Sequence, residues 1–121
     1  MGQRIFIVDD DREVRSLLQS LLEGEGYAVD TTCDGQSAWE RLESQPGAYE
    51  AVFLDLHLPR MTGLQVISAL RQQEADRVWL LVAMSADREA LQQAAALGVS
   101  HALEKPFDLE AVLELVSTRV V

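Results

Sequence analysis

Acidic and polar side chains stand at the ends of four short apolar runs, where buried strands would end. Carboxylates, a hydroxyl and an ammonium group gathered in one place could bind a divalent cation and a phosphoryl group, whose charges and oxygen atoms they complement. The residues are Asp9, Asp10 and Asp11 after the first run, Asp55 at the end of the third, Ser85 after the fourth and Lys105 after the fifth.

The aspartates Asp9, Asp10 and Asp55 would repel one another in a shared crevice unless a cation compensated their charge. Mg²⁺ is the natural candidate, since proteins hold it with one or two carboxylates, water and phosphate oxygens; Mn²⁺ could substitute for it. The chain has no cluster of His and Cys of the kind that binds zinc. A carboxylate can also attack phosphorus and form an aspartyl phosphate, and a lysine such as Lys105 could bind a phosphoryl oxygen.

Each of these residues also has a simpler structural interpretation. Asp11 is favoured as the N-cap of the first helix, and Asp10 stands at capping-box spacing from a glutamate. Ser85 could cap the fourth helix, while Asp55 and Lys105 could be an ordinary strand end and a solvated lysine. The functional interpretation is preferred because four separate segments place complementary chemistry at the same edge of the predicted sheet.

The apolar runs alternate with stretches in which hydrophobic residues recur at helical spacing. The runs are Ile5–Val8, Tyr27–Thr31, Ala51–Leu56, Val78–Met84 and Ser100–Leu103. The helical stretches are Val14–Leu22, Gln36–Ser44, Leu64–Leu70, Ala90–Leu97 and Leu109–Val116.

This alternation predicts one α/β domain over residues 1–121, a (βα)₅ three-layer sandwich around a parallel sheet. The first, third and fourth runs are almost continuously apolar, which is typical of central strands covered on both faces. In the flavodoxin-like strand order 2-1-3-4-5, the order reverses between strands one and three, and ligands bind at such a point. No Gly-x-Gly-x-x-Gly or Walker sequence follows any run, which disfavours a nucleotide-binding fold.

The composition narrows the classes of function. The 121 residues include 20 acidic and 10 basic side chains, a net charge of −10, whereas a nucleic-acid module shows basic clustering. No apolar run approaches the roughly 20 residues that cross a bilayer. A single cysteine excludes an intramolecular disulfide and favours a reducing compartment. We therefore expect a cytoplasmic protein that binds neither nucleic acid nor membrane directly.

Four segments of the chain resemble the receiver domains of two-component response regulators, and the resemblance covers essentially the whole length. Each segment alone is a weak signal, but the four together, in this order and at these separations, are highly specific. They are Ile5–Asp11 (IFIVDDD), Val52–Gly63 (VFLDLHLPRMTG), Met84–Ala86 (MSA) and Glu104–Phe107 (EKPF).

The resemblance implies a phosphoacceptor and a metal site. Asp55 would accept the phosphoryl group. Asp10 and Asp55 would bind Mg²⁺ through their carboxylates and His57 through its backbone carbonyl, with Asp9 assisting directly or through water. The side chain of His57 would flank the phosphoryl group, where tuning the access of water is favoured over a role as catalytic base.

The resemblance also implies phosphoryl-binding and switch residues. Ser85 would donate its hydroxyl to one phosphoryl oxygen and move toward it, Lys105 would bind another, and the small Ala86 would leave the group accessible. The peptide bond between Lys105 and Pro106 would be cis. One position departs from the family: three residues before Lys105, where Tyr or Phe is usual, this chain has Ala102. The usual Ser/Thr-to-aromatic switch therefore cannot operate through that position.

As a receiver, the domain would be a signalling switch with self-catalysed phosphoryl chemistry rather than a metabolic enzyme. Its donor would be the phosphohistidine of a sensor histidine kinase or a histidine phosphotransfer protein. Its target would be a downstream output domain or effector protein, and no output domain is expected within residues 1–121. It would also lose the phosphoryl group slowly by hydrolysis.

Two rival hypotheses come from other functional classes. A phosphatase of the haloacid dehalogenase type also uses an Asp nucleophile, Mg²⁺ and Lys. Its motif, however, is Asp-x-Asp, whereas in this chain His57 stands two places after Asp55. A cap domain is also missing. A receiver-shaped module that binds partners without phosphorylation would usually have lost an acidic site residue, and none is lost here.

Overall fold

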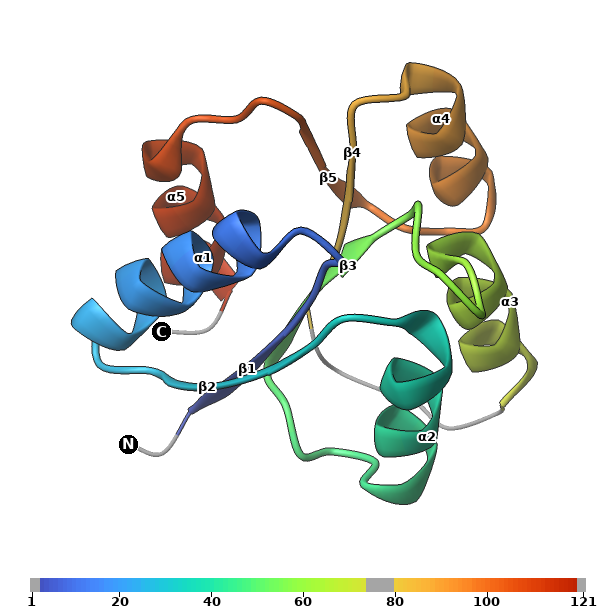
Figure 1. Ribbon diagram of the computed structural model, residues 1–121, viewed down its shortest axis with the longest axis horizontal. Helices are drawn as coiled ribbons and strands as arrows, with labels where there is room; N and C mark the ends of the chain where they lie inside the picture. The colour runs from blue at the N-terminus through green and yellow to red at the C-terminus, as the bar shows by residue number, and fades with distance from the viewer. Residues whose placement is uncertain (1–2, 74–79, 120–121) are drawn as a thin grey trace.

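The structure is a computed structural model that describes residues 3–73 and 80–119. Strands and helices alternate along these residues (Figure 1), and no helix among them has both the length and the apolar character to cross a membrane. The strands are β1 (Arg4–Val8), β2 (Ala28–Thr32), β3 (Ala51–Asp55), β4 (Leu80–Ser85) and β5 (His101–Glu104). The helices are α1 (Arg12–Gly24), α2 (Gly35–Ser44), α3 (Gly63–Gln72), α4 (Arg88–Ala96) and α5 (Leu109–Arg119).

All five strands pair in parallel in one sheet, in the order β2-β1-β3-β4-β5. This order confirms the predicted flavodoxin-like (βα)₅ fold. Every residue of β3 and of β4 is buried, as the continuous apolar runs indicate. The strand order reverses between β1 and β3, so the loops that follow these two strands flank the place where sheets of this kind bind ligands.

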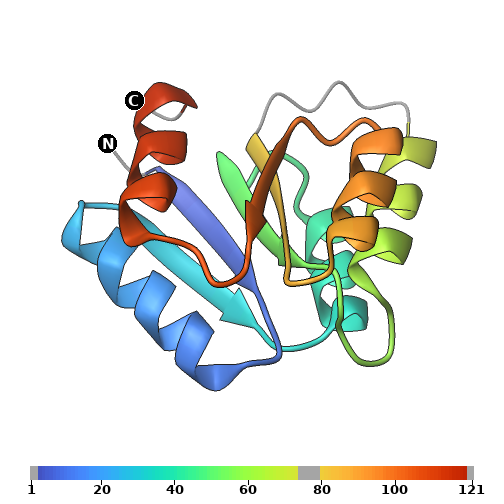
Figure 2. The ribbon, with the colours of Figure 1, turned by 90° about the horizontal axis from the view of Figure 1, so that it is seen from above.

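The side chains of the sheet alternate between two hydrophobic cores, one on each face. In β1, Phe6 and Val8 pack in one core with α2, α3 and α4, whereas Ile5 and Ile7 pack in the other with α1 and α5. Figures 1 and 2 show these two helical layers on opposite sides of the sheet. Because helices cover both faces, the strands are held in place, and their carboxyl ends bring the loops that follow them to one edge of the sheet.

Four helices are preceded by an N-cap residue whose side chain accepts a hydrogen bond from a backbone amide of the first turn. The predicted cap role of Asp11 is confirmed. Since a cap stands before the apolar stripe of its helix, these helices begin one or more residues before the first residue of the predicted stretches. The caps are Asp11 for α1, Asp34 for α2, Thr62 for α3 and Asp87 for α4.

Strand boundaries differ slightly from the predicted runs. β2 begins after Tyr27, because the N–H of Tyr27 donates to Leu22 at the end of α1 and so belongs to the turn. β5 extends to Glu104, which pairs with Ser85. Because Glu104 is charged, a strand prediction based on apolar runs ends before it. The predicted start of the fourth run, Val78, lies outside the described residues.

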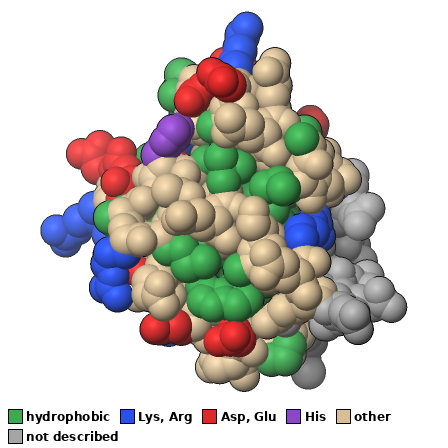
Figure 3. All heavy atoms as spheres, turned by 90° about the vertical axis from the view of Figure 1, so that its right-hand side faces the viewer, with side chains coloured by type: hydrophobic (Ala, Val, Ile, Leu, Met, Phe, Trp, Pro, Cys, Tyr) green, Lys and Arg blue, Asp and Glu red, His purple; other side chains and the backbone are tan. Residues whose placement is uncertain are grey.

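The outer surface of α2, α3 and α4 keeps several hydrophobic side chains partly exposed. Trp39, Leu64, Leu91 and Leu97 pack against the core without being buried in it. Figure 3 faces this side of the molecule and shows hydrophobic side chains, in green, among backbone and other side chains through much of its middle. Hydrophobic contacts on this side of the sheet thus extend from the buried core to the partly exposed side chains of these helices.

Candidate functional site

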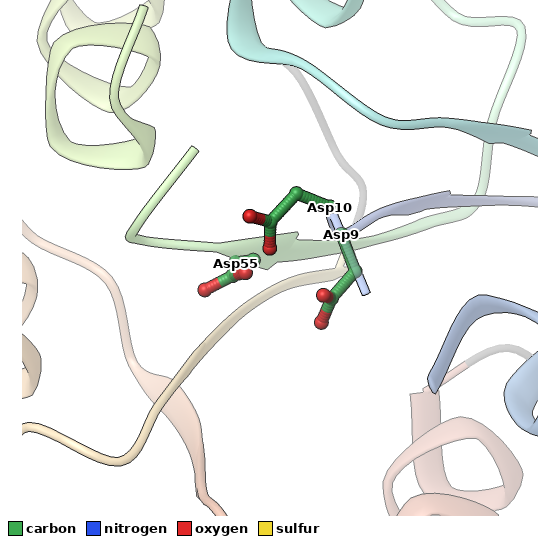
Figure 4. A group of neighbouring side chains, drawn as sticks. All are labelled: Asp9, Asp10 and Asp55. Atoms are coloured by element: carbon green, nitrogen blue, oxygen red, sulfur yellow. The ribbon is translucent and has the colours of Figure 1, made fainter. Parts of the chain in front are cut away.

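The carboxylates of Asp9, Asp10 and Asp55 lie together at the carboxyl ends of β1 and β3 (Figure 4). One oxygen atom from each lies within 4.8 Å of the others. Asp9 and Asp55 are buried, whereas Asp10 is exposed. The structure thus brings together the three carboxylates that the sequence predicts as ligands of a cation, at the point where the strand order reverses.

The carboxyl group of Asp55 is held in surroundings that disfavour its ionised form. Burial raises the pKa of Asp55 to about 6. The backbone N–H of His57, which donates to Oδ1 at 3.1 Å, and the charge of Lys105 act to lower this pKa, whereas the charges of Asp9 and Asp10 act to raise it. A cation beside Asp55 would favour its charged, nucleophilic form.

Lys105 supplies the positive charge nearest to these carboxylates within the described residues. Its Nζ atom lies 2.8 Å from Oδ2 of Asp9 and 3.5 Å from Oδ2 of Asp55. Burial acts to lower the pKa of Lys105, but its hydrogen bond to Asp9 and the charge of Asp55 outweigh burial and raise it above its ordinary value. The lysine therefore stays charged at the site. Its peptide bond to Pro106 is cis.

Asp9 is held by neighbours on three sides. Besides its bond to Lys105, its Oδ1 accepts a hydrogen bond from the backbone N–H of Asp11 at 2.9 Å. Its backbone carbonyl accepts another from the guanidinium of Arg15 at 2.8 Å. The sequence interpretation missed Arg15; its place one helical turn after the capping Asp11 is the signal that could have indicated it.

The donor set fits a hard divalent cation. Within the described part of the chain, the side chain of Asp10 makes no hydrogen bond or ion pair, so it is available as a ligand. Asp55 lies beside it, and the backbone of His57 follows two residues later. Oxygen donors of this kind suit Mg²⁺ and Mn²⁺.

Ser85 ends β4 and is almost fully buried. Its hydroxyl oxygen accepts a hydrogen bond from the backbone N–H of Asp87 at 2.9 Å. Asp87 is the cap of α4, so the alternative in which Ser85 caps this helix is wrong. Met84, which precedes Ser85, pairs with Asp55 in the sheet, so Ser85 follows directly after the residue that is paired with Asp55.

The exposed residues His57 and Ala86 lie in the loops that follow β3 and β4. Nε2 of the His57 ring lies 3.8 Å from Oδ2 of Asp87, and the His57 side chain is 61% exposed. This contact joins the loop after β3 to the start of α4. The sequence interpretation missed Asp87, although an aspartate two residues after Ser85 and directly before a helix is a cap signal.

Ala102 lies in β5, paired with Ala83. It is exposed. It contributes to a surface hollow of about 350 Å³ between β5 and α5, whose other lining residues are Leu103, Ala111, Glu114 and Leu115.

Residues 5–117 of the chain match the family model described as the response regulator receiver domain. The chain is 39% identical over 112 residues to the transcriptional regulatory protein TcrA of Mycobacterium tuberculosis, a match that covers 90% of this chain and 42% of TcrA. It is 35% identical over 105 residues to the transcriptional regulatory protein CpxR of Escherichia coli, covering 87% of this chain and 44% of CpxR. The chain thus spans less than half the length of these curated relatives.

Solved structures give the same family and the same fold. A response regulator signal receiver domain from Bermanella marisrubri superposes with a TM-score of 0.86 at 31% identity and covers 100% of both chains. The chemotaxis response regulator CheY4 of Vibrio cholerae superposes with a TM-score of 0.83 at 26% identity, covering 98% of each chain.

Proposed function

Because the chain belongs to the family of response regulator receiver domains, we propose that it is a phosphorylation-dependent signalling switch with Asp55 as phosphoacceptor. A phosphohistidine, on a sensor histidine kinase or a histidine phosphotransfer protein, is the donor. The observation that carries the proposal is the meeting of three carboxylates within 4.8 Å with the ammonium group of Lys105.

Asp55 is the carboxylate best placed to act as nucleophile. Its Oδ1 accepts the hydrogen bond from His57, and its Oδ2 lies 3.5 Å from the ammonium group of Lys105. Attack by a carboxylate oxygen forms the new O–P bond while the N–P bond of the phosphohistidine breaks, and its electron pair returns to the imidazole ring. Asp55 is buried, so its carboxyl carbon would be shielded from water and hydrolysis of the acyl phosphate would be slow.

Asp10 and Asp55 would hold Mg²⁺ through their carboxylates, with the backbone carbonyl of His57 as a further ligand and Asp9 directly or through water. When bound, the cation neutralises negative charge on the phosphoryl oxygens. Lys105 would act on the same charge, because its hydrogen bond to Asp9 holds its Nζ atom close to Asp55.

Ser85 would report the phosphoryl group to the rest of the domain. Its hydroxyl would donate to a phosphoryl oxygen and move toward it, since a hydrogen bond to a charged acceptor is strong. Because the same oxygen accepts the N–H of Asp87, this movement would weaken that contact and alter the loop before α4. Ala86 has a methyl side chain, which would leave the donor room to approach.

The domain or protein that this receiver would regulate is not part of the described structure. TcrA and CpxR are called transcriptional regulatory proteins, and less than half of each is matched by this chain. We propose that this receiver regulates an output domain or a separate effector protein. With a net charge of −10, it would not bind nucleic acid itself.

A mass measurement tests the proposal. With Mg²⁺ and acetyl phosphate, the protein should gain one phosphoryl group, and peptide mapping should place it on Asp55. Asp55→Asn and chelation of the metal should each abolish the gain, whereas Glu43→Gln, an exposed carboxylate on α2, should not. Full labelling of Asp55→Asn would overturn the assignment. Continuous turnover of a phosphate ester would favour the phosphatase hypothesis, and failure of the wild type to accept phosphate would favour the binding module.

A further inference from the structure

The loop between β3 and α3 contains a strained turn. The N–H of Met61 donates to the carbonyl of Pro59 at 2.8 Å, and the residue between them, Arg60, has a φ of 71°. This is a γ-turn with a left-handed central residue, which is rare and strained when that residue carries a side chain. Within the described residues, Arg60 is the one non-glycine residue with a positive φ. A conformation of this kind persists where neighbouring contacts hold it.

The neighbour that contacts this turn is Gly35, at the start of α2. Its N–H donates to the Pro59 carbonyl at 3.3 Å. The two backbones are so close that a Cβ atom on Gly35 would lie 1.6 Å from the carbonyl oxygen of Met61. Gly35 itself has no left-handed φ. Glycine is therefore needed at position 35 because the two backbones lie so close together, and not because of the backbone conformation of Gly35.

Asp34 forms an ion pair with the exposed side chain of Arg60. Oδ2 of Asp34 lies 3.7 Å from the Arg60 guanidinium, and the Asp34 side chain is only 12% exposed. Asp34 is itself fixed by Ser37, whose N–H and hydroxyl donate to it at 2.7 Å and 3.1 Å. These hydrogen bonds, with the charge of Arg60, keep the pKa of Asp34 below its usual range. Arg60 thus faces a fixed anion.

The same loop begins at the carboxylate site. At its far end, a Cβ atom on Gly63 would lie 2.3 Å from the carbonyl oxygen of Asp55, and the N–H of Gly63 donates to Leu56 at 3.1 Å. The loop is therefore closed at its base by Gly63 and braced at its outer turn by Gly35. His57, whose N–H donates to Asp55, lies between these two contacts.

We propose that Asp34 and Gly35 are positioning residues for the metal site, acting through the Pro59–Met61 turn on the backbone of His57. A side chain at position 35 must displace the Met61 carbonyl. Because Gly63 holds the base of the loop, the displacement passes to the segment that contains His57. The part of the inference that concerns the cation rests on the proposed function.

Gly35→Ala tests the close contact, with Gly26→Ala as its control. Gly26 has a φ of 96° and no atom within 4 Å of a built Cβ, so its substitution costs stability through the backbone alone. In Gly35→Ala, the Mg²⁺ dissociation constant from calorimetry should rise about 10-fold or more, as when an outer-shell partner of a metal ligand is removed. In metal-free protein, the amide NMR signals of Asp55 and His57 should also shift. Gly26→Ala should change neither measurement.

The outcomes separate this inference from the proposed function. If Gly35→Ala binds Mg²⁺ as the wild type does, with unshifted amides, the positioning role is overturned and the proposed function stands. If the wild type binds no Mg²⁺, the metal site and the inference about it both fail.

The ion pair is tested by Asp34→Asn and Arg60→Ala, which also decide the matter if Gly35→Ala does not fold. Asn keeps the α2 cap. Long-range electrostatics alone would change Mg²⁺ affinity in opposite directions, since one variant loses a negative charge and the other a positive one. A positioning role instead raises the dissociation constant in both, by about two- to five-fold. The double variant should lose no more than the larger single loss, and Arg60→Lys should restore part of it. The role of the pair would be overturned if the two single variants changed the Mg²⁺ affinity in opposite directions, if their losses of affinity added up in the double variant, or if the affinity did not change.

Discussion

The Nζ atom of Lys105 lies 2.8 Å from a carboxylate oxygen of Asp9, although the two residues are 96 positions apart in the sequence. The Asp9 side chain is completely buried, and that of Lys105 is 23% exposed. The lysine thus compensates a buried charge in the unphosphorylated protein and lies only 3.5 Å from Asp55, within easy reach of a group attached there.

Lys105→Met should destabilise the protein, because it leaves the buried Asp9 carboxylate without its cation. Removing one partner of a buried hydrogen-bonded charge costs about 1–3 kcal/mol or more, and urea unfolding at pH 7 with a chelator measures it. Asp9→Asn combined with Lys105→Met should recover most of the loss, since the uncompensated charge is then gone. A single variant as stable as the wild type would contradict the pairing.

The raised pKa of Asp55 predicts a pH-dependent effect of Asp55→Asn on stability. The folded-state pKa of about 6 lies above the ordinary value of 3.8, so the folded state holds a proton that the unfolded state releases. The stability from this proton is complete below pH 3.8 and is lost as the pH rises through 6. In chelator at pH 8, Asp55→Asn should therefore be more stable than wild type, by up to about 3 kcal/mol for a shift of this size.

The difference in stability between Asp55→Asn and the wild type should shrink toward pH 4. It should also shrink in excess Mg²⁺, which favours the ionised wild-type carboxylate. Urea unfolding at several pH values measures both trends, with Glu43→Gln as a control for loss of an exposed carboxylate. An advantage that is independent of pH would show that ionisation of Asp55 is not its cause.

The parallel sheet and the shared edge of Asp9, Asp10 and Asp55 could be predicted because they follow from local features, whereas the strand order comes from the flavodoxin-like fold. Continuous apolar runs mark β1, β3 and β4, and in a parallel sheet the residues that follow them share one edge. Asp11 could be identified as a cap for the same reason, since its partners are the next residues along the chain. The roles of the site residues in phosphoryl transfer, the single domain and the cytoplasmic location stay predictions.

The contacts that fix the site could not be predicted, because they depend on how distant loops meet. Nothing near Gly35 in the sequence indicates that its backbone touches Met61. The partner of Arg60 is likewise an aspartate in another loop. Periodicity specifies which face of an element is buried, but it does not specify which backbone atoms of two loops come together.

His57→Ala should accelerate loss of the phosphoryl group from Asp55 several-fold. The His57 ring lies in the loop that follows Asp55, with Nε2 3.8 Å from the Asp87 carboxylate, so removing it should open the site to water. Gel separation of phosphorylated protein over time measures the rate. Asp87→Asn keeps the α4 cap but removes the charge that faces the ring, and should show a smaller acceleration. Slower loss in His57→Ala would instead indicate that the ring activates the attacking water.

The last prediction concerns how phosphorylation reaches the surface. Ser85 accepts the N–H of Asp87, and Asp87 caps α4, so movement of the hydroxyl toward Asp55 releases a contact at the start of this helix. A hydrogen bond from Ser85 to a charged phosphoryl oxygen is worth about 1.5–3 kcal/mol, enough to shift a two-state loop. Ala102 has no ring to turn inward, so the response should be concentrated in residues 85–88 and weak in β5.

Amide NMR shifts with and without beryllofluoride, a phosphoryl mimic, measure this distribution in the wild type and in Ala102→Tyr. The wild type should respond most at Ser85–Arg88. Ala102→Tyr should gain a response in β5, because its ring can move when Ser85 moves. Ser85→Ala, which lacks the hydroxyl, should lose most of the response at residues 85–88 while still binding the mimic through Asp55 and Lys105. If the largest wild-type changes lie at His101–Leu103, the signal leaves the site through β5, and the route through Asp87 and α4 is wrong.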